Sequence, residues 1–185
     1  MNTKPTKTSG REMHRRQIQI LRQTAWLAVL LSVLGGPLTA WAQAGASAYR
    51  YAAPSGWTRS IEADIEALTP ADPQTQAQIM LLAPKPLAAD FDAQFASERA
   101  SLESFWGLRS PQAAPLQRGQ SSKGQYAAHF ASYDSDGGER YMSFLALGNG
   151  GSFAMVVFVA AGAETFNRLA PVATEAFRTL EVNRR

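Results

Sequence analysis

The chain has 185 residues, the length of one ordinary domain, and its 45% hydrophobic content excludes wholesale disorder. Its formal net charge of +3 is misleading, because residues 1–44 carry six basic side chains and only one acidic one. Residues 45–185 keep 12 basic and 14 acidic side chains, so they lack the basic surface that a nucleic-acid partner requires. The absence of cysteine excludes disulfides, zinc–thiolate sites and thiol nucleophiles.

The first 44 residues have the organisation of a secretory signal peptide. A polar, basic stretch precedes an uncharged apolar run at residues 25–34, which Gly35-Gly36-Pro37 ends. Two overlapping small-x-small motifs follow within residues 40–44, as signal peptidases require. We therefore expect residues 1–44 to be a signal peptide and residues 45–185 to be a single α+β domain. The protein is then periplasmic or secreted after cleavage, and meets the membrane only through the uncleaved signal peptide.

Two alternatives to cleavage by the general secretory route stay open. Residues 24–42 carry no charge over 19 positions, which is long enough for an uncleaved membrane anchor. Arg15-Arg16 resembles a twin-arginine export signal, although the residues after it fit that pattern poorly. No cysteine follows the apolar run, so lipoprotein processing is excluded.

We expect the mature N-terminus to be Gln43 or Gly45, directly after one of the two small-x-small motifs. Intact-mass measurement of the protein from a periplasmic extract checks this position. A full-length chain that stays in the membrane fraction would show that the leader is an anchor.

The first half of the mature domain combines extended chain with one helix. Strands are expected at residues 49–53, 57–61 and 77–83, while residues 62–68 fit a strand or a helix. A helix is expected to begin after the N-cap Asp90 and to end at Gly107. Its apolar stripe consists of Phe91, Phe95, Leu102 and Trp106. We interpret this stripe as core packing, with an exposed aromatic binding face as the alternative.

The second half predicts an antiparallel meander and a closing helix. Three strands are expected at residues 125–133, 139–147 and 152–160, with a weaker strand at 114–119. The third is apolar on both sides, so it should be central, with Phe158 in the core. A helix spans residues 166–180, with a kink or break expected just before Pro171, and residues 181–185 form a polar tail. The fold class is therefore α+β, with about six antiparallel strands sandwiched by helices.

Motifs that carry chemistry are few. His129 is the only histidine after residue 44, and we expect an ordinary packed side chain, with a catalytic or pH-sensing role as the alternative. Residues 134–139 resemble a calcium loop but lack its third acidic position, so a hairpin turn is expected. Residues 148–151 lack the Lys-Ser/Thr of a phosphate-binding loop, and no G-x-S-x-G motif occurs. We expect no catalytic residue, metal or cofactor.

The order of these motifs resembles the Mog1/PsbP-like fold family, particularly its small secreted bacterial members. The resemblance rests on Tyr51, Pro54-Ser55-Gly56-Trp57, Ile79-Met80-Leu81-Leu82, Phe91, Phe95, Gly124-Gln125-Tyr126, Phe177 and Leu180. It implies a mostly non-enzymatic protein: a binding module, assembly factor, chaperone-like adaptor, or an immunity or lipid-associated protein. The family offers no catalytic residues to carry over. The missing lipidated cysteine separates this chain from the lipoprotein members.

We expect a non-catalytic binding or accessory protein with a protein partner, and a hydrophobic small molecule or lipid as the second choice. The alternatives are an envelope-structural or stress protein without a defined ligand, and a hydrolase that would bring a serine, His129 and an aspartate together. Trp57 and Trp106 are the candidate binding residues, because tryptophans beside turns and helix ends are often half exposed. The alternative is that both simply cap the core.

Overall fold

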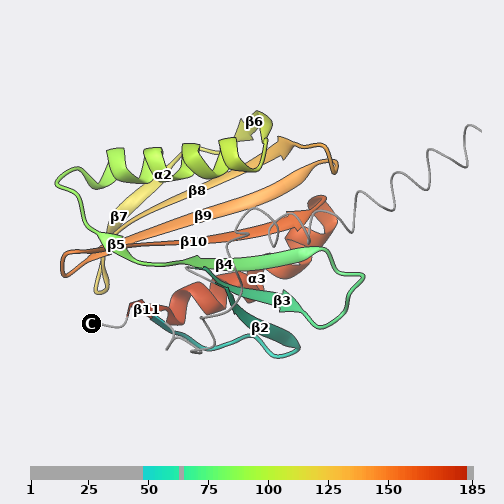
Figure 1. Cartoon of the computed structure of the whole chain (residues 1–185), viewed down its shortest axis with the longest axis horizontal. Helices are drawn as coiled ribbons and strands as arrows, with labels where there is room; N and C mark the ends of the chain where they lie inside the picture. The colour runs from blue at the N-terminus through green and yellow to red at the C-terminus, as the bar shows by residue number, and fades with distance from the viewer. Residues whose placement is uncertain (1–47, 63–64, 183–185) are drawn as a thin grey trace, which may run out of the picture. The chain divides into compact units, whose positions relative to one another are not determined.

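The computed structural model describes residues 48–62 and 65–182, and in this part of the chain two helices pack against an antiparallel sheet (Figure 1). The helices are α2 (Phe91–Phe105) and α3 (Ala163–Thr179). The strands are β1 (Tyr49–Arg50), β2 (Trp57–Glu62), β3 (Ile65–Pro70), β4 (Ala77–Leu82), β5 (Lys85–Pro86), β6 (Arg109–Ala113), β7 (Gln117–Ser121), β8 (Gly124–Asp134), β9 (Arg140–Asn149), β10 (Ser152–Ala161) and β11 (Glu181–Val182).

Nine of the described strands form one sheet, in the order β2-β3-β4-β10-β9-β8-β6. In addition β5 pairs with β10, and β7 pairs with β8, while β1 and β11 form a separate pair. The expected α+β class with an antiparallel sheet between helices is confirmed. The expected number of about six strands was too low, because two-residue pairings such as β5 carry no alternating pattern in the sequence.

The pleat of the sheet divides the apolar side chains between two clusters. On one face α3 covers Phe158 and its neighbours, with Phe166 and Ala173 as its buried contributions. On the other face α2 covers the middle of the meander, with Phe91 and Phe95 as its buried contributions. Strand β10 lies between β4 and β9 and is buried on both sides, as its double-sided apolar pattern predicted. Figure 1 shows α2 and α3 as separate layers around these strands.

Helix α2 begins and ends at the capping residues that the sequence predicts. The Asp90 side chain accepts a hydrogen bond from the Ala93 backbone N–H at 2.9 Å, which satisfies one of the free donors of the first turn. The helix ends at Phe105, followed by Trp106 as the C-cap and by Gly107 with a φ of 60°. The N-cap and end expected from the sequence are thus confirmed.

Of the kink or break expected just before Pro171, the break is wrong, because α3 continues through this residue from Ala163 to Thr179. Proline removes the hydrogen bond to the carbonyl four residues earlier, that of Asn167. Both residues are exposed, so water can solvate that carbonyl. Meanwhile Phe166 and Ala176 hold the helix against the sheet on either side of the proline.

Three segments with weak or ambiguous sequence patterns form strands. Of the ambiguous residues 62–68, Glu62 ends β2 and residues 65–68 belong to β3. The weak strand expected at 114–119 is instead two strands, β6 and β7, that both pair with β8. Part of the expected polar tail forms β11, which pairs with β1 and ties the two ends of the described chain together.

The expected signal peptide and its cleavage site lie outside the described residues, so both stay predictions. In the part of the chain that the structure does describe, neither helix is long and apolar enough to cross a membrane.

Candidate functional site

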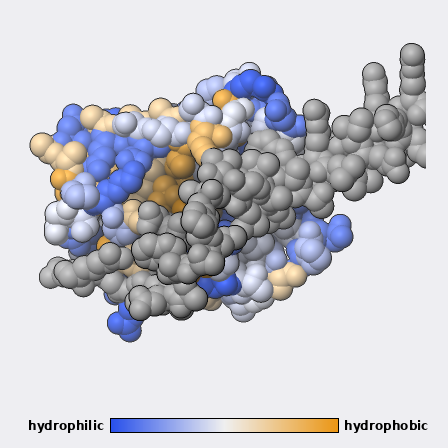
Figure 2. All heavy atoms as spheres, in the orientation of Figure 1, coloured by the Kyte–Doolittle hydropathy of each residue, from blue (hydrophilic) through white to orange (hydrophobic). Residues whose placement is uncertain are grey.

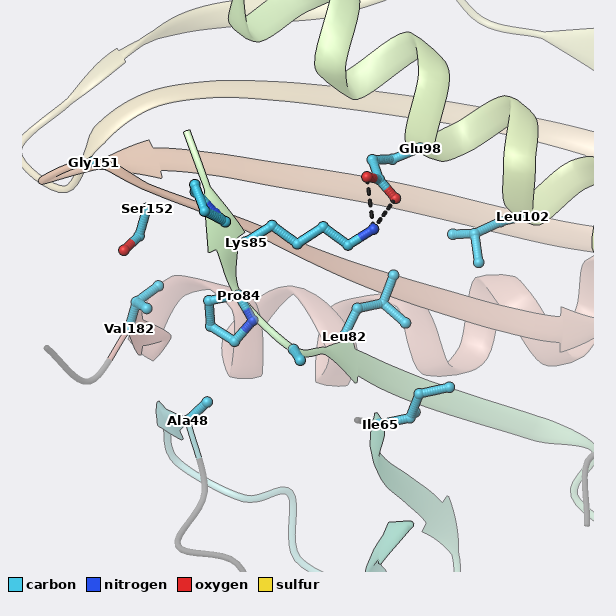
Figure 3. Close-up of a pocket in the computed structure, with 12 residues that line it drawn as sticks. Ala48, Ile65, Leu82, Pro84, Lys85, Glu98, Leu102, Gly151, Ser152 and Val182 are labelled. Carbon is cyan, nitrogen blue, oxygen red and sulfur yellow. Dashed lines mark hydrogen bonds and ion pairs between the residues drawn. The ribbon is translucent and has the colours of Figure 1, made fainter. Parts of the chain in front are cut away.

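A groove of about 800 Å³ lies between α2, the end of β4 with β5, and the β1–β11 pair. Its apolar lining includes Ile65, Leu82, Pro84, Leu102 and Val182 (Figure 3). Leu82 and Leu102 approach from opposite walls, the first from β4 and the second from α2. Figure 2 shows hydrophobic surface in the region beside α2. The groove therefore offers partly exposed apolar side chains to a ligand.

The groove exists because α2 does not cover the whole face of the sheet. Among the described residues, the helix packs on β9 more than on the end of β4. Beyond Leu82 the chain passes through Pro84, which has no N–H to donate to a neighbouring strand. Ile65, the first residue of β3, is the partner of Leu82 in the β3–β4 register. The apolar side chains at this corner thus remain half-buried.

One ion pair spans the groove. Lys85 extends from β5 toward α2, and its Nζ lies 2.7 Å from both carboxylate oxygens of Glu98 (Figure 3). The pair neutralises its own charges, so it leaves no net charge at this position. An exposed pair of this kind stabilises a fold by about 1 kcal/mol at most. Its main consequence is to fix the position of two flexible side chains at the groove.

Backbone acceptors near the groove already have donors. The hydroxyl of Tyr49 donates to the carbonyl oxygen of Leu82. Burial, followed by the nearby charge of Glu66, raises the pKa of Tyr49, so the hydroxyl keeps the proton that it donates. The Nε2 of Gln94 on α2 donates to the carbonyl of Pro86 at 3.0 Å. A ligand in the groove would therefore contact mainly side chains, because these two backbone carbonyl groups already accept hydrogen bonds.

A polar cluster lies beneath α2, on strand β8. The hydroxyl of Tyr133 donates to Glu103 at 2.7 Å, and Arg99 Nε lies 3.2 Å from the same carboxylate without the geometry of a hydrogen bond. His129 is only 8% exposed, and its Nδ1 has no hydrogen-bond partner among the described residues. Its ring lies against Phe144 at a centroid distance of 6.2 Å. Burial, and then the charge of Arg99, lower the pKa of His129, while Glu103 acts in the opposite direction.

We expect acidification to destabilise the fold through His129. Because its pKa is lower in the folded than in the unfolded state, the unfolded state binds the proton first as the pH falls. The contribution of neutral His129 is complete above the unfolded pKa of about 6.5 and is lost as the pH falls from that value toward the lower pKa of the folded state. Urea unfolding of residues 45–185 between pH 7.5 and 5.5 should show this decline. His129→Gln should flatten it, and an equal slope in both proteins would refute the assignment.

Two arrangements that the catalytic and metal-binding alternatives would need are not found among the described residues. Within residues 48–62 and 65–182, no serine or aspartate is hydrogen-bonded to His129, as the hydrolase alternative would require. Across the same described residues, no group of three or more His, Cys, Asp and Glu side chains could hold a metal ion. The acidic segment before Arg140 is the turn between β8 and β9, where Asp136 pairs with Arg109 at 2.9 Å.

The structure places the two candidate tryptophans apart. Trp57 begins β2 and is half-buried against the cluster beneath α3. Trp106 caps α2 and is half-buried against the cluster on the opposite face. Neither is among the described residues that line the groove. Their proposed role in binding stays a prediction.

Sequence patterns missed the groove and one exposed aromatic residue. Phe105 on α2 is 62% exposed. The apolar stripe expected from the sequence includes the next residue, Trp106, and not Phe105. The sequence signal that could have located the groove is the pair Pro84 and Pro86, which interrupts a strand beside a helix. Only the packing of α2 over β9 decides which apolar residues then remain accessible.

Comparisons with known proteins find similarity at the level of the fold. No family model matches the chain, and no curated protein matches it in sequence. The Ran-binding protein Mog1p of Saccharomyces cerevisiae superposes with a TM-score of 0.54 at 10% identity, over 73% of this chain and 90% of Mog1p.

Two further solved structures are similar. LpqN of Mycobacterium tuberculosis, which is involved in cell envelope biogenesis, gives a TM-score of 0.53 at 15% identity, over 74% of this chain and 83% of LpqN. The cyanobacterial PsbP protein of Synechocystis gives 0.52 at 9% identity, over 80% of this chain and 100% of that protein. The order and pairing of its elements thus give this chain a Mog1/PsbP-like fold.

Proposed function

We propose that this chain is a non-catalytic, exported accessory protein that binds a protein partner through the groove between α2 and β4–β5. The observation that carries the proposal is the groove itself, where half-buried leucines from two elements face one another. Apolar side chains that stay accessible on a folded domain are typical of interaction sites. Residues 1–44 support export to the periplasm or beyond, because they have the organisation of a signal peptide.

The comparisons add support at the level of the fold. Mog1p is a Ran-binding protein, so the same architecture can serve protein recognition. LpqN is involved in cell envelope biogenesis, which is compatible with a role outside the cytoplasm. Tyr133 and Arg99 both contact Glu103, so these polar groups are engaged with one another within the fold.

A hydrophobic small molecule or lipid is the second candidate ligand. The groove volume of about 800 Å³ supports this candidate, because small-molecule sites have volumes of roughly 300–1,000 Å³. We rank it second because the groove is open enough to show half-exposed side chains from several elements, whereas small-molecule sites enclose most of their ligand.

Co-purification from a periplasmic extract tests the proposal. The full-length chain carries a C-terminal tag, and an unrelated exported protein with the same tag is the control. We expect one protein to be enriched in stoichiometric amount with this chain and to be absent from the control. Enrichment of lipid alone would favour the second candidate. Recovery of neither would leave the envelope-structural alternative and contradict the proposal.

A further inference from the structure

We infer that the groove receives an amphipathic helix of the partner, and that Phe105 is the aromatic anchor of this docking surface. The inference rests on the proposed function and makes it more specific. It combines three observations on the described residues: an exposed aromatic residue on the groove side of α2, backbone groups that are already paired, and a lining without an unpaired cation.

Phe105 shares one side of α2 with two residues that line the groove. Glu98 and Leu102 line the groove, and Phe105 follows Leu102 by three residues. With 3.6 residues per turn, the three side chains lie within roughly 60° of one another around the helix axis. Phe105 is 62% exposed, so the core of this domain does not account for it. Exposed aromatic residues next to apolar pockets are typical anchors of protein interfaces.

The groove is poorly suited to an extended peptide. A strand that adds to a sheet edge needs free N–H and C=O groups along that edge. Pro84 and Pro86 have no N–H, the carbonyl of Pro86 accepts from Gln94, and the carbonyl of Leu82 accepts from Tyr49. An extended ligand would therefore bury backbone groups without partners, which is costly. A helix satisfies its backbone internally and needs only side-chain contacts.

The charges near the groove favour a neutral apolar face over an anionic amphiphile. Lys85 is the cation that the structure places in the described lining, and it is paired with Glu98. On the same helix, Arg99 is directed to Glu103. An anionic headgroup would have to break one of these pairs. The apolar side of an amphipathic helix needs no counter-charge, and helix-in-groove docking uses apolar anchors spaced by three or four residues.

Photo-crosslinking tests the inference in the full-length protein in its own cells. p-Benzoylphenylalanine replaces Phe105 in one variant and Ala100 in a matched variant, because Ala100 is exposed on the far side of the same helix. We expect a protein adduct from position 105 and none from position 100. The crosslinked peptide, sequenced by mass spectrometry, should carry apolar residues at i, i+3 or i+4, and i+7. Alternating apolar residues, a lipid adduct or a crosslinked dimer of this chain would overturn the inference.

A third crosslinking position separates failure of this inference from failure of the proposed function. Thr174 is exposed on α3, on the other side of the sheet. Protein adducts from position 174 without any from 105 would show that a partner binds elsewhere. The protein-binding function would then stand, and the helix-in-groove inference would fail. The absence of protein adducts from all three positions would contradict both.

A synthetic peptide with the crosslinked sequence completes the test. It should gain helical circular dichroism when the protein is added, whereas a scrambled peptide should not. Phe105→Ala should weaken its binding at least about tenfold, and Phe105→Leu should restore part of the affinity. Because Phe105 is exposed, both variants should keep the wild-type unfolding temperature. Unchanged affinity of Phe105→Ala would overturn the role of this residue as the anchor.

Discussion

Phe158→Ala is expected to lower the free energy of unfolding by about 3–5 kcal/mol, the usual cost of truncating a buried aromatic side chain. Phe158 is 1% exposed in the central strand β10 and stacks on Phe166 of α3 at a centroid distance of 5.0 Å. Its neighbours belong to two layers, so a local shift cannot refill the cavity. Urea unfolding monitored by circular dichroism measures the change.

Asp136→Ala is the control for this experiment. Asp136 is 75% exposed in the turn after β8, and its ion-pair partner Arg109 is 62% exposed. Exposed ion pairs contribute little, so the variant should lose less than about 1 kcal/mol. Equal losses in the two variants would show that Phe158 is not a core residue.

Gly124→Ala is expected to be the second strongly destabilising change, with a loss of more than about 3 kcal/mol. Gly124 has a φ of 109°, where a side chain is strained by about 1–3 kcal/mol. An added Cβ would also lie 2.3 Å from the backbone carbonyl oxygen of Gly148, so the β8–β9 pairing would have to shift. Because this contact is backbone, no side-chain rotation can relieve it.

Gly150→Ala separates the two effects. Gly150 also has a positive φ, 57°, but an added Cβ would meet nothing within 4 Å. The free energy of unfolding of Gly150→Ala should therefore fall by only about 1–2 kcal/mol, the cost of the backbone strain alone. Parallel urea unfolding of the two variants checks the difference. A Gly124→Ala protein as stable as Gly150→Ala would refute the close approach of β8 and β9.

The central sheet and α2 were predictable because their local signals agree with their packing. Strand β10 is apolar on both sides, and it proves to be buried on both sides. Asp90 predicted the start of α2, and its side chain does accept from the first turn. Alternating residues and a capping carboxylate act over a few positions, so one sequence suffices to detect them.

The sequence mispredicts a break at Pro171 and gives no direct sign of the groove. Both features depend on contacts between residues that are distant in the sequence. Whether a proline breaks a helix depends on how strongly the flanking residues pack, and Phe166 and Ala176 pack against the sheet. Phe105 and Trp106 are adjacent aromatic residues in the sequence, but only the position of α2 over the sheet leaves Phe105 exposed. Trp57 and Trp106 are distinguished in the sequence only by their neighbours, and those neighbours carry no information on the position of α2.

Binding through the groove is tested by the affinity of the purified partner for two lysine variants of α2. Leu102→Lys puts a charge into the groove, whereas Ala100→Lys adds the same charge on the exposed far side of the helix. Isothermal titration calorimetry, on variants whose circular dichroism matches the wild type, should show binding weakened at least about tenfold by Leu102→Lys. Ala100→Lys should bind like the wild type. Wild-type affinity in both variants, or equal weakening in both, would contradict binding through the groove.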